Sequence, residues 1–249
     1  MVKNIIIGQK SFVTKSILKY LKNPIVFSAN ELTKKKIQEQ THNYKKINLV
    51  FNNFYPSKLL NDLNHNNYND LCNLSLSKIS LLFETIPSSK INKIIYTSSA
   101  AIYRLIENIS NQKSDHYNRE LYSSFKLAAE KLILNYSCSK NKDYFIMRLF
   151  NTYGDSQDKF SFIEKIIRAK KEKTRLTLIN EGLSLRDFIH LDDIGKIYTI
   201  FLNKKLNKGI YDIGSGKGFL IKDLVKVAKI PKNKLIKKNK IEEIKDSIA

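Results

Sequence analysis

With 249 residues, the chain is long enough for one large domain or for a main domain with a small second lobe, and its 42% hydrophobic content supports a sizeable buried core. Its 44 Lys and Arg residues against 23 Asp and Glu residues give a net charge of +21, which favours anionic ligands such as nucleotides and phosphates. The lysines are dispersed, and no arginine-rich arm or zinc-finger spacing accompanies them, so we expect solvated lysine-rich faces rather than a nucleic-acid interface.

Strands and helices alternate along the first 150 residues. Short β-branched runs predict buried parallel strands, and apolar residues at helical spacing predict the helices between them. The expected strands are residues 2–7, 24–27, 47–51, 93–97 and 144–150, and the expected helices are residues 12–21, 31–40, 68–86 and 121–136. The Asn-rich segment 52–69 is expected to be a loop. This alternation predicts an α/β fold, a doubly wound parallel sheet of the Rossmann type.

The turn after the first strand is the candidate cofactor turn. A dinucleotide-binding turn carries glycines that let the backbone approach a pyrophosphate at a helix N-terminus. That pattern would place glycine at positions 8, 11 and 14, and only Gly8 is present, although Ser11 and Thr14 are small. Taken alone, the turn fits an ordinary strand–helix connection equally well. The candidate cofactor-binding residues here are Gly8, Ser11, Phe12 and Val13.

The end of the second strand normally carries an acidic residue that binds the adenine ribose of NAD. Here the strand is followed by Asn30, which is a candidate cofactor contact, and the nearest acid is Glu31. Residues 34–36 are all lysine, which leaves room for a 2′-phosphate. The sequence therefore leaves NAD and NADP as alternatives.

The strongest candidate chemistry lies between the fourth strand and the helix that follows it. Thr97 and Ser99 place small hydroxyl groups at the carboxyl end of that strand, where ligands bind in such folds. Tyr122 and Lys126 are four residues apart, so both project from one face of a helix, about 6 Å apart along its axis. A neighbouring ammonium group favours the phenolate and is expected to lower the pKa of Tyr122 from about 10. The same spacing also occurs by chance on helices that carry a packed tyrosine and an exposed lysine.

Five segments then occur in a fixed order. They are residues 98–103 (Ser-Ser-Ala-Ala-Ile-Tyr), 122–130 (Tyr-x-x-x-Lys-Leu-Ala-Ala-Glu), 148–154 (Arg-Leu-Phe-Asn-Thr-Tyr-Gly), 186–193 (Arg-Asp-Phe-Ile-His-Leu-Asp-Asp) and 209–216 (Gly-Ile-Tyr-Asp-Ile-Gly-Ser-Gly). Together they resemble the extended short-chain dehydrogenase/reductase family, in particular its NAD-dependent epimerase/dehydratase branch typified by UDP-glucose 4-epimerase. The resemblance covers residues 2 to about 228.

The resemblance implies roles for individual residues. Ser99, Tyr122 and Lys126 would form a catalytic triad that moves a proton while hydride passes between a sugar carbon and the nicotinamide, and Ser99 would also touch the substrate. Thr97, Tyr122 and Lys126 would contact the NAD or NADP cofactor. Asn73 resembles a helix asparagine that supports the site in the family, although an ordinary helix asparagine fits as well.

The resemblance also implies partners. Asn151 and Arg186 would contact a nucleotide-sugar substrate, although Arg186 and Asp187 could instead form a structural ion pair. Family members pair through two helices that correspond here to residues 68–86 and 121–136, so a homodimer is expected.

Departures from the family pattern keep alternatives open. The turn at residues 8–14 lacks two glycines, and the C-terminal lobe is short. We expect residues 1–150 to bind the cofactor and 151–249 to bind the substrate, with part of 186–216 returning to the sheet. No Asp-Glu pair follows Ser99, which argues against a dehydratase. The expected function is a nucleotide-sugar epimerase or 4-keto reductase, and the alternative is a family member that binds a dinucleotide without turnover.

Other kinds of site are not indicated. Cys72 and Cys138 lie far apart, which suggests reduced thiols rather than a disulfide framework, and the four histidines form no ligand-spaced cluster. No apolar run approaches the roughly 18 residues that span a bilayer, and no signal peptide is evident. We therefore expect no metal, no membrane partner and a cytoplasmic protein.

Overall fold

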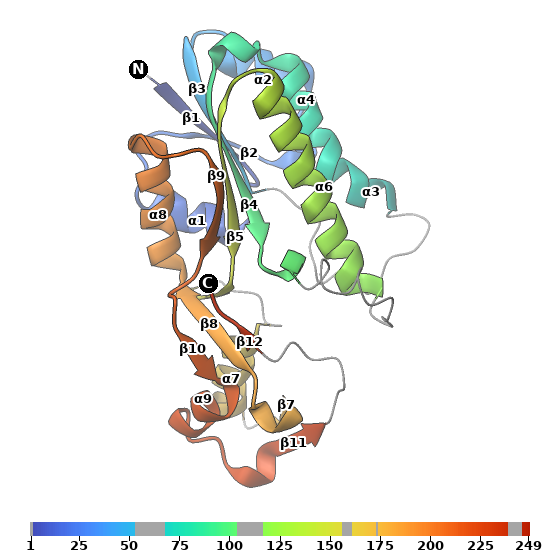
Figure 1. Ribbon diagram of the computed structural model, residues 1–249, viewed down its shortest axis with the longest axis vertical. Coiled ribbons are helices and arrows are strands. Elements are labelled where there is room, and N and C mark those ends of the chain that lie inside the picture. Colours follow the sequence, from blue (N-terminus) through green and yellow to red (C-terminus); the bar gives the residue numbers. More distant parts are fainter. Residues whose placement is uncertain (1, 53–67, 104–116, 156–160, 173, 239–245) are drawn as a thin grey trace. The chain divides into compact units, whose positions relative to one another are not determined.

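The computed structural model describes residues 2–52, 68–103, 117–155, 161–172, 174–238 and 246–249 (Figure 1). Contacts within the chain divide it into two compact units. The first consists of Met1–Arg148 and Ile194–Tyr211, and the second consists of Leu149–Asp193 and Asp212–Ala249. Most of the segment expected to be a loop, residues 53–67, lies outside the described residues. Each unit has its own cluster of buried apolar side chains.

The first unit is built on a six-stranded sheet with the strand order β2-β1-β3-β4-β5-β9. β1 pairs in parallel with β2 and β3, and β3 pairs in parallel with β4. The strands are β1 Val2–Ile7, β2 Ile25–Phe27, β3 Lys46–Phe51, β4 Ile91–Ser99, β5 Asp143–Leu149 and β9 Gly209–Ile213. Ile5, Ile6 and Ile7 are all fully buried, as expected for a strand covered on both faces. The sheet confirms the predicted Rossmann-like fold.

Helices cover this sheet. They are α1 Phe12–Leu18, α2 Lys34–Thr41, α3 Tyr68–Cys72, α4 Lys78–Thr85, α6 Tyr117–Ser139 and α8 Leu191–Asn203. Figure 1 shows α4 and α6 side by side, away from α1 and α8. The contact between α1 and α8 requires a glycine, because a Cβ on Gly195 would lie 2.7 Å from the Ser16 hydroxyl and 2.8 Å from the Tyr20 ring.

Two helices differ from the sequence prediction. α2 begins three residues late because the short 3-10 turn Ala29–Glu31 precedes it, and the Thr33 side chain caps it by accepting a hydrogen bond from the Lys36 amide at 3.2 Å. The single helix expected over residues 68–86 is interrupted by a π-helical turn, Asn73–Ser77. Such turns insert one residue into the helical repeat, which hydrophobic spacing alone does not reveal.

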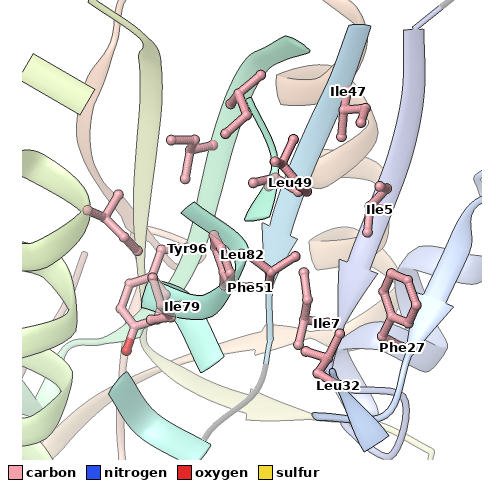
Figure 2. Close-up of a cluster of buried hydrophobic side chains, with 14 of the residues drawn as sticks. Ile5, Ile7, Phe27, Leu32, Ile47, Leu49, Phe51, Ile79, Leu82 and Tyr96 are labelled. Atoms are coloured by element: carbon pink, nitrogen blue, oxygen red, sulfur yellow. The ribbon is translucent and has the colours of Figure 1, made fainter. Parts of the chain in front are cut away.

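The main apolar cluster packs α4 and α6 against the sheet (Figure 2). Ile5 of β1 and Leu49 of β3 belong to it, and both are fully buried. Ile79 of α4 and Ala129 and Ile133 of α6 belong to the same cluster. Full burial of an aliphatic side chain stabilises the fold by about 1.5–3 kcal/mol. The cluster therefore fixes the position of α6 relative to the strands.

Several lysines of the first unit bind connecting segments through backbone carbonyl groups. The Lys3 ammonium donates to Asn23 O at 2.7 Å, and the Lys90 ammonium donates to His42 O at 2.9 Å. Lys93 donates to three carbonyls at the end of α8, at 2.6–3.2 Å, which belong to Phe201, Leu202 and Lys204. Some of the ammonium groups that make up the positive charge therefore stabilise the fold by binding its backbone.

The second unit contains a small sheet around β8 Leu185–His190. β10 Gly218–Leu220 pairs with β8 antiparallel, and β6 Asn151–Tyr153 and β12 Asp246–Ser247 pair with it in parallel. β7 Leu176–Ile179 and β11 Leu235–Lys238 form a separate parallel pair. α7 Phe162–Lys171 and α9 Ile221–Val227 contribute to one buried cluster with these strands.

A ladder of asparagine side chains crosses the six-stranded sheet. Asn48 of β3 donates to Asn4 Oδ1 of β1 at 2.8 Å, and Asn92 of β4 donates to Asn48 Oδ1 at 2.8 Å. Asn48 is 3% exposed, and the two outer asparagines are half-buried. The central amide is therefore the one whose polar atoms depend most on the ladder.

Replacing Asn48 with alanine should lower the free energy of unfolding by about 2 kcal/mol, because it removes two hydrogen bonds and leaves both partners in a partly buried place. Replacing Asn92 with alanine removes one bond, so a loss of about 1 kcal/mol is expected. Urea unfolding followed by circular dichroism measures both values. Equal losses in the two variants would contradict this account of the ladder.

Candidate active site

Ser99, Tyr122 and Lys126 lie together in the first unit. Ser99 is the last residue of β4, and the other two residues lie on one face of α6. The Ser99 side chain is hydrogen-bonded to that of Tyr122. The Lys126 ammonium lies 5.9 Å from the centre of the Tyr122 ring. The structure therefore places the three side chains close together.

The Lys126 ammonium is almost enclosed by protein. The residue is 4% exposed, its Nζ donates to Thr97 O at 2.7 Å, and Nζ lies 5.0 Å from the centre of the Tyr96 ring. Loss of hydration disfavours the charged form and lowers the pKa of Lys126 to about 7, while the Glu130 carboxylate opposes that shift. Near neutral pH the amine therefore exists in both protonation states.

Tyr122 shows the opposite of the shift expected from the sequence. Burial raises the pKa of Tyr122 to about 12, although the hydrogen bond with Ser99 acts in the other direction. The ring packs in an apolar cluster with Leu71 and Phe125. Desolvation by burial is the larger of these two effects. In the free protein Tyr122 is thus a phenol at neutral pH, and its use as a base requires further positive charge in the site.

A buried ion pair stands beside the three residues. Arg148 donates from Nε to Glu130 Oε1 at 3.1 Å and from Nη2 to Glu130 Oε2 at 2.8 Å. The Glu130 side chain is 1% exposed. Ser98 donates to the same carboxylate at 2.5 Å, and the Arg148 guanidinium lies 4.7 Å from the centre of the Tyr103 ring. The pair therefore joins α6 to β5, and the Ser98 bond joins the same carboxylate to the end of β4, next to Ser99.

The candidate cofactor turn joins β1 to α1. Gly8 has a φ of 107°, a conformation that favours glycine, and its amide donates to Phe27 O at 2.9 Å. Ser11 is the N-cap of α1, but its side chain makes no cap hydrogen bond. The amides of the first helical turn, at Phe12 and Val13, therefore lack a side-chain cap. Uncapped amides at a helix N-terminus are suitable donors for a pyrophosphate.

The residues after β2 leave the choice of dinucleotide open. Asn30 is exposed in the 3-10 turn Ala29–Glu31. The Glu31 carboxylate accepts a hydrogen bond from the Lys36 ammonium at 2.9 Å. The acid nearest to the position that binds the adenine ribose in NAD enzymes is thus already partnered by a lysine.

The sequence did not predict the parts played by Asn52 and Tyr198. The Asn52 side chain accepts a hydrogen bond from the Thr97 hydroxyl, and the Tyr198 hydroxyl lies 2.5 Å from the same Thr97 oxygen. Asn52 falls at the edge of the segment expected to be a loop, and Tyr198 belongs to a distant helix. Glu130 was predictable in part, because it lies four residues after Lys126 on the same helical face.

The two predicted substrate residues, Asn151 and Arg186, belong to the second unit and line one cavity. Asn151 Nδ2 donates to Asp187 O at 2.8 Å. The Asp187 carboxylate accepts hydrogen bonds from the Ser215 amide and hydroxyl, each at 2.7 Å, and from the Gly216 amide at 2.8 Å. These bonds tie the carboxylate to the turn after β9, and the ion pair with Arg186 that the sequence also allowed stays a prediction.

The cavity has a volume of about 620 Å³. Cationic side chains form much of its lining: Lys165, Arg168, Arg175, Arg186 and Lys238. No carboxylate occurs among its described lining residues, and apolar side chains such as Leu178 and Phe188 form another part of the wall. A cavity with a cationic part and an apolar part suits a phosphate-bearing ligand that also carries a ring.

The described residues also bear on the metal, disulfide and membrane-spanning features that the sequence raised. Within the described ranges, no group of three His, Cys, Asp or Glu residues could hold a metal ion. Cys72 and Cys138 are both exposed and form no disulfide. No helix in the part of the chain that the structure describes is long and apolar enough to cross a membrane.

Comparison with known sequences gives a family match. The model of the NAD dependent epimerase/dehydratase family matches residues 25–214. The dTDP-D-glucose 4,6-dehydratase of Dictyostelium discoideum is 30% identical over 146 residues, which are 54% of this chain and 34% of that protein. A putative UDP-glucose 4-epimerase of Methanocaldococcus jannaschii is 25% identical over 216 residues, 83% of this chain and 68% of that protein. The chain thus matches about a third of the first relative and about two thirds of the second.

Solved structures share the fold. The UDP-N-acetylglucosamine 4-epimerase of Methanobrevibacter ruminantium, in complex with UDP-N-acetylmuramic acid, matches with a TM-score of 0.75 at 19% identity, over 99% of this chain and 88% of that one. The UDP-glucose 4-epimerase of Thermus thermophilus, in complex with NAD, matches with a TM-score of 0.72 at 14% identity, over 100% of this chain and 90% of that one. At these identities the likeness establishes the fold.

The lowered pKa of Lys126 makes folding stability depend on pH. Between about pH 7 and 10.5 the unfolded chain binds this proton and the folded chain does not, so stability rises with pH across that window, by up to about 1.4 kcal/mol per pH unit. A Lys126→Met variant lacks the proton in both states. Wild type should therefore gain stability relative to the variant between pH 7 and 10.

Urea unfolding of both proteins at pH 7, 8.5 and 10 measures this difference. Comparison at each pH removes the contributions of groups that the two proteins share. A difference that stays constant over the three values would mean that Lys126 keeps its ordinary pKa.

Proposed function

The chain belongs to the NAD dependent epimerase/dehydratase family, and on that premise we propose that it is an NAD(P)-dependent enzyme that epimerises or reduces a nucleotide sugar. The observation that carries the proposal is the meeting of Ser99, Tyr122 and Lys126 at the end of β4. A phenol, a hydrogen-bonded hydroxyl and a desolvated amine at one point are the groups that proton transfer to or from a sugar oxygen needs.

Tyr122 exchanges a proton with the sugar hydroxyl that becomes a carbonyl group, or with the carbonyl that becomes a hydroxyl. Ser99 is hydrogen-bonded to Tyr122 and holds the same sugar oxygen. Lys126 stabilises the phenolate, because its ammonium lies 5.9 Å from the centre of the Tyr122 ring in a place with little water. Lys126, Tyr122 and Thr97 also contact the nicotinamide half of the cofactor in this proposal.

The residues of the first turn fit a dinucleotide. Gly8 lets the backbone take a positive φ, and the uncapped amides at Phe12 and Val13, with the Ser11 hydroxyl, would hold the pyrophosphate. Asn30 would meet the adenosine half. A bound nicotinamide supplies the hydride donor or acceptor, and its oxidised ring adds the positive charge that the phenolate of the site requires.

The cavity of the second unit would hold the nucleotide diphosphate of the substrate. Arg186 contributes a guanidinium group and Asn151 an amide, and the cationic lining as a whole attracts the two negative charges of a diphosphate. The names of the relatives, several of which are epimerases of UDP sugars, support this assignment. In this proposal the first unit binds the cofactor and carries the reacting groups, and the second unit binds the substrate.

The family contains more than one reaction. An epimerase oxidises and re-reduces one carbon and keeps its cofactor, whereas a 4-keto reductase consumes reduced cofactor in each turnover. The absence of an Asp-Glu pair after Ser99 argues against dehydration. A second candidate function, dinucleotide binding without turnover, is favoured by the loss of two of the three glycines of the turn.

We also propose that the protein is a homodimer. The segments that the family resemblance implicates form α3, α4 and α6, and Phe83 of α4 stacks on Tyr136 of α6 with ring centres 3.8 Å apart, so α4 and α6 form one surface. Light scattering during size-exclusion chromatography should give twice the chain mass of 28.9 kDa. A mass of one chain at micromolar concentration would contradict the dimer.

Incubation with a panel of nucleotide sugars, with and without NADPH, tests the proposed function. Isomerisation of the substrate without consumption of cofactor indicates an epimerase, and a gain of two hydrogens in mass spectrometry indicates a reductase. Tyr122→Phe should lower the turnover of the accepted substrate by about 10²-fold or more, the scale of general acid–base catalysis. Dinucleotide affinity should change little, because the ring remains.

Three outcomes count against parts of this proposal. Turnover of Tyr122→Phe within a few-fold of wild type would make Tyr122 a packing residue. Dinucleotide binding with no turnover of any sugar would favour the second candidate function. Failure of NADH and NADPH to bind at millimolar concentration would exclude both.

A further inference from the structure

A series of buried hydrogen bonds crosses the carboxyl ends of β1, β3 and β4. The Tyr198 hydroxyl of α8 binds Thr97 Oγ1 at the end of β4, and the Thr97 hydroxyl donates to Asn52 Oδ1 at the end of β3. Asn52 Nδ2 donates to Thr14 Oγ1 at 3.0 Å. The Thr14 hydroxyl donates to the carbonyl oxygen of Gly8 at 2.8 Å.

All four bonds run in one direction. The Thr97 hydrogen is used on Asn52, so the Tyr198 hydroxyl must be the donor in the bond between the two hydroxyls. The Thr97 and Thr14 hydroxyls therefore each donate once and accept once, an arrangement in which each bond polarises the next. Tyr198 and Thr14 are fully buried, and Asn52 and Thr97 are 8% and 9% exposed. Water cannot readily take the place of any partner in such a setting.

The series joins the two halves of the proposed cofactor site. At one end is Gly8, the glycine of the turn. The other end is Tyr198, and next to it lies Thr97, whose backbone carbonyl accepts a hydrogen bond from the Lys126 ammonium at 2.7 Å. Asn52 lies between Gly8 and Thr97 and is itself fixed to β1, because its backbone amide donates to Ile7 O at 2.8 Å. The Asn52 side chain, directly after β3, thus sets the separation between the turn and the end of β4 that binds the lysine.

We propose that Thr14, Asn52 and Thr97 position the cofactor turn relative to Lys126. Thr14 stands where the usual turn has a glycine, and its hydroxyl supplies two of the bonds that hold the turn in place. This inference rests on the proposed function. Glycine there allows close packing of helix against strand. In this chain the space holds a hydroxyl that links Gly8 to Asn52, so a Thr14→Gly substitution should weaken dinucleotide binding rather than improve it.

Paired valine substitutions test the link, because valine removes a threonine hydroxyl at nearly constant volume. Thr14→Val and Thr97→Val should each weaken NADH or NADPH binding by about 10-fold, read from cofactor fluorescence, and the double variant by about the same factor instead of the roughly 100-fold of independent sites. Thr14→Ser, which keeps the hydroxyl, should reverse most of the valine effect. Thr41→Val is the matched control, since Thr41 is 5% exposed and its hydroxyl donates to Ile37 O at 2.7 Å in α2, outside the series.

Hydrogen–deuterium exchange of the chain without cofactor separates this inference from the proposed function. The Ser11 amide donates to Gly8 O, so Thr97→Val should speed exchange in the turn at residues 8–14, although position 97 is remote in sequence, and Thr41→Val should not. If wild type binds no dinucleotide but this pattern appears, the link stands and the proposed function fails.

Three results would overturn the link. They are additive losses of affinity in the double variant, tighter dinucleotide binding by Thr14→Gly, and unchanged turn exchange in Thr97→Val. If the valine variants fail to fold, Tyr198→Phe removes only the first donor of the series. It should speed turn exchange to a smaller degree, and no change there would equally overturn the link.

Discussion

The hydrogen bond from the Lys126 ammonium to the Thr97 carbonyl ties the helix that carries Tyr122 to the strand that ends in Ser99. It spans 2.7 Å in a place that solvent barely reaches. Desolvation holds the pKa of the lysine near 7, so its charge responds to any group placed beside it. Much of the first unit can be understood as a frame that keeps this one amine in position.

The Glu130–Arg148 pair belongs to that frame. A carboxylate four residues after Lys126 attracts the ammonium and favours its charged form. Arg148 binds both oxygens of that carboxylate, and Ser98 binds one of them, so Glu130 is fixed by groups other than the lysine. A buried ion pair seldom adds much net stability, because both charges lose hydration. Its value here lies in orientation, since it holds β5, α6 and the Lys126 amine in one arrangement.

The fold could be predicted from the sequence because the patterns that indicate it are local. The buried isoleucines of β1 and the four-residue spacing of Tyr122 and Lys126 are properties of single elements, and the structure has both. The predicted lowering of the Tyr122 pKa was wrong, because burial depends on packing from several elements, which the spacing of residues along one helix does not reveal. The contact between Thr97 and Tyr198 joins residues 101 positions apart, so no local pattern could indicate it. The π-helical turn was missed for a related reason, since an inserted residue leaves the apolar repeat nearly intact.

The lysines that bind backbone carbonyls change how the net charge of this protein is understood. Lys3, Lys90 and Lys93 act as anchors for connecting segments, and the Lys93 ammonium closes the end of α8 by bonding three carbonyls. A reagent that acetylates amines would therefore release loops as well as neutralise surface charge. Amine-coupled immobilisation or cross-linking of this protein would meet the same difficulty, and attachment through the exposed thiols of Cys72 and Cys138 would leave the anchors in place.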